Sequence, residues 1–271
     1  MPKKIKFLIK IAFIILSFII IFQKIDLAQL KNIHLKNPFW LFIGFILFNL
    51  SQIISALRVH LYLQNIKITP TFKKQIMLYY VGMFYNTILP GGIGGDAYKA
   101  YKFEKSYQKG YKLIIKALLI DRISGLFAIF FLLGILLSTK FSWLFIIITL
   151  FTPLFLFFIK RVFFKEFTFL PFVFSIIAQL LQMFTFLTIL LSLGVNFHII
   201  DFLILFFISS IVSVIPISIG GVGLRELTFL YGLEYLHINP VYGIMGAFLF
   251  FIISIISSAI GAIFLKGVKD V

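Results

Sequence analysis

The sequence of 271 residues contains no cysteine, which excludes disulfides, iron–sulfur clusters and zinc sites built from thiolates. Acids are scarce as well: nine Asp and Glu accompany 25 Lys and Arg, so few carboxylates remain for general acid–base work. The four histidines form no metal-ligand spacing. No arrangement of nucleophile, base and acid and no P-loop occurs. These absences argue against an enzyme, and we expect neither a metal nor a cofactor.

Long hydrophobic runs dominate what is present. Hydrophobic residues make up 61 % of the chain, and the mean hydropathy is +1.10. Several windows exceed the roughly 18 apolar residues that span a bilayer. We therefore expect an all-α integral membrane protein with a single polytopic domain over residues 1–271. The first apolar run resembles a signal peptide, but no small-residue cleavage site follows it, so we interpret it as a retained first span.

The net charge of +16 raises the question of a nucleic-acid partner. The lysines, however, gather in short loops beside the apolar runs, which is the pattern that the positive-inside rule produces in membrane proteins. No segment is long and polar enough for a nucleic-acid-binding domain, so we expect no such partner.

Hydropathy predicts six full spans and two further apolar segments that either cross the membrane or dip in and return. The six spans are 7–23, 39–57, 113–138, 141–159, 169–193 and 241–265. The two other segments are 75–89 and 201–219. Basic residues flank 75–89 on both sides, whereas Arg225 is the only one near 201–219. The charges therefore favour re-entry of 75–89 from the cytoplasm and of 201–219 from outside.

The same charges orient the whole chain. With both termini in the cytoplasm, 17 basic residues lie on the cytoplasmic side and five on the outer side. We therefore expect a multi-pass protein of the inner (plasma) membrane. Its oligomeric state does not follow from the sequence.

A six-residue pattern occurs twice, near the ends of the two ambiguous segments. Pro90-x-x-Ile93-Gly94-Gly95 recurs 126 residues later as Pro216-x-x-Ile219-Gly220-Gly221. Proline and glycine leave backbone groups unpaired, and hydrocarbon tolerates this only inside protein or beside a water-filled cavity. Matched broken segments in two halves of a membrane protein are typical of a transporter's binding site.

The flanking elements repeat with the pattern. Unit one covers 39–138 and unit two covers 169–265, and the predicted topology makes the two units inverted. Two re-entrant tips would then meet near the middle of the membrane. The tip residues that we single out are Asn86, Pro90, Gly91, Gly92, Gly94, Gly95, Pro216, Ser218, Gly220, Gly221 and Gly223.

Asp121 and Arg122 lie inside an apolar run, where a charge costs at least roughly 2.5–3.5 kcal/mol and usually has a partner or faces a cavity. Adjacent helical residues point about 100° apart, so each needs another partner. We expect Asp121 to meet Arg58 or Lys116. For Arg122 we expect Asp96 or a lipid phosphate. The alternative role is a buried ion pair that fixes helix packing.

Each glycine pattern leads into a helix start that carries an acid, Asp96 in the first copy and Glu226 in the second. Helix N-termini attract phosphate or carboxylate, and each acid is equally suited to cap its own helix. Arg225 is the only basic residue in the second region, and arginine is a good planar ligand for phosphate.

Four stretches together resemble one family, the flippase-like family named for the transmembrane region of lysylphosphatidylglycerol synthase. They are LRVHLYL (57–63), FYNTILPGGIGGDAYKAYK (84–102), DRISGLF (121–127) and PISIGGVGLRE (216–226). The resemblance covers about 40–265. Lys99 and Asp121 stand where the family commonly has Arg and Glu. The residues that match family positions are Arg58, Asn86, Pro90, Gly94, Gly95, Asp96, Pro216, Gly220, Gly221, Gly223 and Glu226.

The resemblance implies lipid translocation. It makes Arg58, Lys99, Arg122 and Arg225 candidate ligands for a lipid phosphate, with Asp96, Asp121 and Glu226 as charge partners. The 271 residues include no synthase domain, so we expect a transporter of a lipid made elsewhere, either an anionic phospholipid or a polyprenyl-phosphate-linked sugar. Two alternatives stay open: a membrane-embedded accessory subunit or enzyme of cell-envelope glycoconjugate synthesis, and a small-solute carrier.

Overall fold

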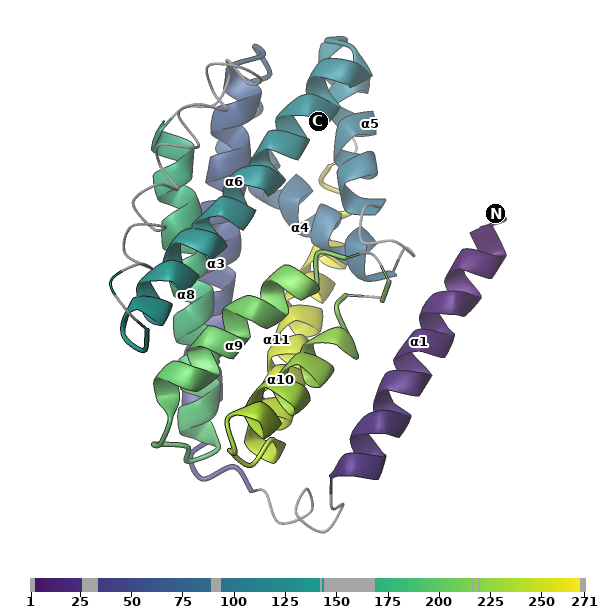
Figure 1. The fold of residues 1–271 in the computed structure, drawn as a ribbon. Helices are drawn as coiled ribbons and strands as arrows, with labels where there is room; N and C mark the ends of the chain where they lie inside the picture. Colours follow the sequence, from purple (N-terminus) through teal and green to yellow (C-terminus); the bar gives the residue numbers. More distant parts are fainter. Residues whose placement is uncertain are drawn as a thin grey trace.

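The computed structural model describes residues 3–25, 34–88, 94–141, 143, 169–215, 217–218 and 220–268. Within these residues the chain forms helices and no strands, so the prediction of an all-α fold is confirmed (Figure 1). The helices are α1 (Lys3–Lys24), α3 (Phe39–Gln64), α4 (Phe72–Ile88), α5 (Gly94–Tyr107), α6 (Tyr111–Ser138), α8 (Phe169–Ser192), α9 (Ile199–Val212), α10 (Leu224–Tyr235) and α11 (Val241–Phe264).

In the described part of the chain, four helices are long and apolar enough to cross a membrane. They are α3, α6, α8 and α11, and they coincide with four of the six predicted spans. The span predicted at 7–23 lies in α1, a 22-residue helix that also carries several lysines. The span predicted at 141–159 falls, apart from its first residues, outside the described part.

The long helices of the two units run in opposite directions. The backbone N–H of Lys36, before α3, donates to the carbonyl oxygen of Ser192 at the end of α8, at 2.8 Å. Near the other end of this helix pair, Arg58 of α3 reaches Ser175 of α8 at 3.2 Å. Since the start of one helix lies beside the end of the other at both places, α3 and α8 are antiparallel.

Two helical hairpins occupy the places where the sequence pattern repeats. The first hairpin consists of α4 and α5, and the second consists of α9 and α10. Their four helices are 12 to 17 residues long, shorter than the about 20 residues that span a bilayer. The helix α9 ends at Val212, earlier than the predicted segment 201–219, as expected where a proline follows within a few residues.

The two hairpins approach from opposite ends of the bundle. The first hairpin leads into the start of α6 through 108–110. The start of the second hairpin lies at the other end of α6, where Lys140 pairs with Asp201 at 3.1 Å. In Figure 1 the helices α4 and α5 lie in the upper part of the bundle, and α9 and α10 lie in the lower part.

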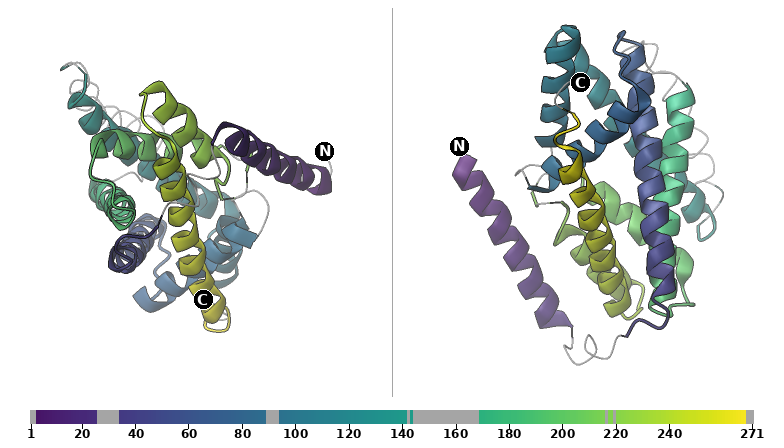
Figure 2. Two further views of the ribbon diagram at one scale, coloured as in Figure 1. Left: turned by 90° about the horizontal axis from the view of Figure 1, so that it is seen from below. Right: turned by 180° about the vertical axis from the view of Figure 1, so that it is seen from behind.

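Each hairpin has its own hydrophobic core. Around the second hairpin, the ring of Phe186 stacks on Phe206 at 4.9 Å and on Phe229 at 5.2 Å between ring centroids. Around the first hairpin, buried side chains such as Leu78 and Phe103 form a separate cluster. The helix α1 stands at the edge of the bundle and packs against α10 (Figure 2).

Candidate functional site

A buried ion pair links α3 to α6. Arg58 Nε donates to Asp121 Oδ1 at 2.6 Å, and Arg58 Nη2 donates to Asp121 Oδ2 at 3.1 Å. Both residues are buried, with 6 % and 7 % of their surface exposed. The two-pronged geometry is the arrangement that arginine and carboxylate favour, and it confirms Arg58 as the partner of Asp121.

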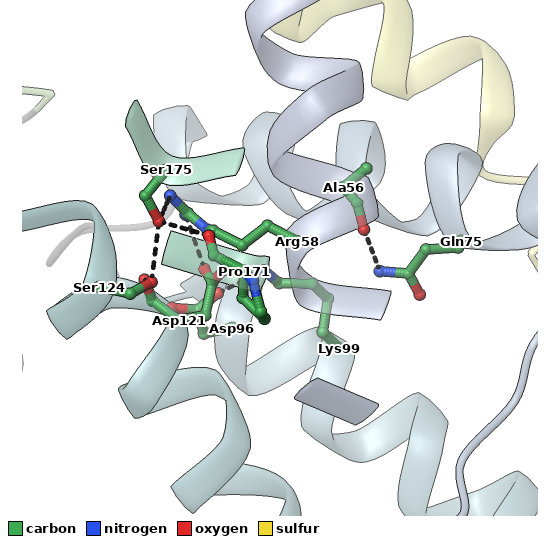
Figure 3. A network of polar contacts seen from close by, with 9 residues as sticks. All are labelled: Ala56, Arg58, Gln75, Asp96, Lys99, Asp121, Ser124, Pro171 and Ser175. Atoms are coloured by element: carbon green, nitrogen blue, oxygen red, sulfur yellow. Dashed lines mark hydrogen bonds and ion pairs between the residues drawn. The ribbon is translucent and has the colours of Figure 1, made fainter. Parts of the chain in front are cut away.

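Small side chains make room for this pair and complete its hydrogen bonds (Figure 3). Arg58 Nη1 donates to Ser175 Oγ at 3.2 Å, and Ser175 Oγ lies 3.1 Å from Ser124 Oγ. A side chain at Gly125 would come within 3.2 Å of Arg58 Nη1, so glycine lets the guanidinium lie against α6. Because Ser175 belongs to α8, the network ties the two units together.

A second charge group centres on Asp96, in the first turn of α5. Lys99 Nζ lies 2.6 Å from Asp96 Oδ1, and Arg122 Nε donates to Asp96 Oδ2. The ion pair confirms Asp96 as a partner of Arg122. The Asp96 carboxylate therefore lies between two cations, Lys99 and Arg122.

The two groups meet on α6, since Asp121 and Arg122 are neighbours in sequence. Asp121 faces the buried interior and Arg122 has 45 % of its side chain exposed. In the ion pairs that the structure describes here, Asp96 and Asp121 face Arg58, Lys99 and Arg122. The ion pair with Asp96 therefore holds the partly exposed guanidinium of Arg122 beside the start of α5.

The two helices of the first hairpin are held together by a side-chain hydrogen bond and by a close backbone contact. Asn86 Oδ1 accepts a hydrogen bond from the N–H of Gly95 at 2.8 Å, which ties the end of α4 to the start of α5. A Cβ atom at Gly95 would lie 1.8 Å from the carbonyl oxygen of Gly82, so the two helices touch through glycine. Asn86 therefore has a structural role at the tip.

The second hairpin is organised differently. Glu226 Oε2 accepts from the N–H of Gly223 at 2.7 Å and so caps α10, while Gly223 has a positive φ of 84° that favours glycine. The guanidinium of Arg225 lies 5.1 Å from the centroid of the Phe250 ring. Among the described residues, Arg225 makes no ion pair, and the buried hydroxyl of Ser218 has no hydrogen-bond partner.

The structure thus brings together most of the predicted charged residues. Arg58, Asp96, Lys99, Asp121 and Arg122 form one connected neighbourhood. No described contact joins Arg225 to it, so the expected convergence of all the arginines on one cavity stays a prediction. Four predicted tip residues, Pro90, Gly91, Gly92 and Pro216, lie outside the described part of the chain.

Three members of the neighbourhood were not anticipated from the sequence. They are Ser124, Ser175 and Tyr79, whose ring lies 5.1 Å from Lys99 Nζ. Ser124 follows Asp121 by three residues, and its hydroxyl donates to the Asp121 carbonyl oxygen at 2.8 Å. That i,i+3 spacing within an apolar run was the available signal. Ser175 and Tyr79 gave no comparable signal, because they come from other helices.

Long apolar helices, two short hairpins and buried ion pairs define a polytopic helical membrane protein. A family model described as the lysylphosphatidylglycerol synthase TM region matches residues 7–173 and 165–261. The chain therefore belongs to that family, as its sequence motifs indicated. Neither a curated protein nor a solved structure gave a significant match.

Proposed function

We propose that this protein moves a phosphate-bearing lipid between the leaflets of the inner membrane. The observation that carries the proposal is the pair of hairpins entering the bundle from opposite ends, with a charged neighbourhood beside the first. Inverted repeats with broken helices near the midplane are a common design of secondary transporters. Family membership supports a lipid-related role in the membrane.

In this proposal the hairpins are re-entrant, and the two units 39–138 and 169–265 form an inverted repeat within one domain. Equivalent packing supports it: α4 lies against α11 of the other unit, and α9 lies against α6. The proposed orientation has both termini in the cytoplasm, in agreement with the excess of lysine on that side. Lipid headgroups would pass between the two tips.

The charged groups have distinct parts in the proposal. The Arg58–Asp121 pair is buried, is bonded at two points and also reaches Ser175, so its role is to hold α3, α6 and α8 together. Arg122 and Lys99 both pair with Asp96, and Arg122 is partly exposed, so we assign these two cations to the binding of an anionic headgroup. Arg225 is the corresponding phosphate ligand at the second tip. No catalytic role is assigned to any of them.

Native mass spectrometry of the protein extracted with its membrane lipids tests the lipid class. We expect a phosphate-bearing lipid to stay bound, and the Arg122→Gln variant to retain less of it. The Lys67→Gln variant, which changes an exposed lysine in the loop after α3, is the matched control and should retain as much as the wild type. Equal retention by all three proteins, or retention of uncharged lipids alone, would contradict the proposal.

A further inference from the structure

Glu226 has a buried carboxyl oxygen that no described group satisfies. Only 1 % of the residue is exposed, and its Oε2 accepts the single hydrogen bond from Gly223. The other oxygen, Oε1, is buried and has no hydrogen-bond partner among the described residues. An ionised carboxylate in such a place is costly, since burial removes its hydration and the described structure offers its side chain the hydrogen bond from Gly223 in return.

The polar and charged groups near Glu226 on α9 and α10 make their described contacts with other groups. Arg225, on the same helix, lies over the ring of Phe250 and beside Gly221 and makes no described ion pair with Glu226. From α9, the hydroxyl of Ser213 also lies beside Gly221 and donates to the Ser209 carbonyl oxygen at 2.6 Å.

The helix α1 supplies no counter-charge that the structure pairs with Glu226. The hydroxyl of Ser17 packs against Gly223 but donates to the Phe13 carbonyl oxygen at 2.8 Å. Lys10 lies two turns, about 10 Å, from Ser17 along α1. Lys24, at the end of α1, pairs with Glu234 at 2.6 Å.

Glu226 also lines a pocket of about 200 Å³ whose other walls are apolar. The remaining lining residues are Phe18, Ile21 and Phe22 of α1 and Ile244, Met245 and Phe248 of α11. The surroundings favour the neutral carboxylic acid over the carboxylate.

We propose that Glu226 binds a proton whose uptake is coupled to the binding of a lipid phosphate beside it at Arg225. The inference rests on the proposed function, which places the phosphate at Arg225. On uptake, a proton from water forms one O–H bond with the carboxylate, and its release restores the carboxylate. Acids buried at membrane depth commonly serve as proton relays.

The coupling follows from electrostatics. A phosphate at Arg225 adds negative charge close to Glu226 and so favours its protonated form. By thermodynamic linkage, the protonated protein then binds the phosphate more tightly. A lipid carried with a proton would thereby have its negative charge partly compensated during passage.

Equilibrium binding of fluorescent phosphatidylglycerol to the full chain, in nanodiscs of phosphatidylcholine, tests the coupling. We expect the affinity of the wild type to rise about tenfold as the pH falls from about 8 to about 6. Glu226→Gln, which imitates the protonated acid, should bind tightly with no dependence on pH. Glu234→Gln, at the far end of the same helix, should keep the wild-type dependence, and Arg225→Gln should bind weakly throughout.

Infrared spectroscopy of the same samples reads the proton directly. We expect a C=O stretching band of a protonated carboxyl that titrates with pH and is missing in Glu226→Gln, with folding checked by size-exclusion chromatography. Binding that is independent of pH in the wild type, or a dependence that persists in Glu226→Gln, overturns the inference and leaves the proposed function standing. If neither this probe nor a fluorescent polyprenyl phosphate binds at any pH, the lipid proposal fails, and absence of the Glu226 band then overturns the proton site as well.

Discussion

At the scale of single residues, the charges on α3 and α6 beside the first hairpin differ in how much each one matters to folding. Arg58 and Asp121 are buried and bonded to each other at two points, whereas Arg122 is half-exposed. Breaking a buried pair leaves one charge without a partner, which is far more costly than the loss of an exposed pair.

We therefore expect Asp121→Asn to lower the free energy of unfolding by about 3–5 kcal/mol, because it leaves the buried guanidinium of Arg58 without its counter-charge. Thermal unfolding of the purified variant in detergent measures the loss. Glu234→Gln is the control, since its partner Lys24 is 40 % exposed, and it should change the midpoint little. Equal shifts in the two variants would show that the Arg58–Asp121 pair does not hold the fold.

The sequence was sufficient to predict both ion pairs of α6, although not uniquely. Two neighbouring charges in an apolar run require separate partners, and the candidates were Arg58 or Lys116 for Asp121 and Asp96 or a lipid phosphate for Arg122. What the sequence does not contain is the direction of each side chain relative to other helices. For that reason Ser175 and Tyr79 escaped notice, and the position of Arg225 against Phe250 was not foreseen.

At the scale of the helix, the first hairpin depends on contact between two backbones. The position that a Cβ would take at Gly95 is 1.8 Å from the carbonyl oxygen of Gly82. The reverse substitution is less severe, since a Cβ at Gly82 would meet mainly carbons of the Lys99 side chain, the nearest at 3.2 Å. A flexible side chain is able to move, whereas the backbone of a packed helix is not.

We expect Gly95→Ala to separate α4 from α5 and to destabilise the protein by about 1–3 kcal/mol, the usual cost of overpacking. Gly82→Ala should be tolerated better, because Lys99 is able to shift. Expression level and thermal midpoint of the two variants measure the difference. If both variants are as stable as the wild type, the close approach of the two helices is not required.

The repeated proline–glycine pattern was enough to locate both hairpins. Their exact ends were harder, since α4 begins at Phe72 and α9 stops at Val212, whereas the predicted segments were 75–89 and 201–219. Hydropathy misses the polar residues that a helix includes at its ends, as at the start of α4. It also ignores the proline that follows the end of α9. The pairing of each hairpin with helices of the other unit depends on packing that no local pattern encodes.

At the scale of the whole molecule, the account depends on the two hairpins entering from opposite faces of the membrane. Single cysteines are readily placed, since the chain has none of its own. Lys105 lies exposed near the end of α5, and His237 lies exposed in the loop after α10. We expect a cysteine at position 105 to react with an impermeant reagent only after the cells are opened, and one at position 237 to react in intact cells. Labelling of both positions from the same side would contradict the inverted arrangement.

The number of long helices followed largely from the sequence, because a run of apolar residues long enough to span a bilayer has few other uses. Four of the six predicted spans correspond to α3, α6, α8 and α11, and α1 covers a fifth. The separate cores around the two hairpins did not follow, since aromatic stacking such as that of Phe186 between Phe206 and Phe229 joins residues distant in sequence.

The central claim is that the purified chain moves a phosphate-bearing lipid across a bilayer. The most direct measurement is the rate at which fluorescent phosphatidylglycerol becomes accessible to an impermeant quencher in liposomes containing the protein. We predict a rate above that of protein-free liposomes, with a lower rate for Arg122→Gln at equal protein content. A rate that equals the protein-free value, for this lipid and for a polyprenyl-phosphate probe alike, would contradict the account.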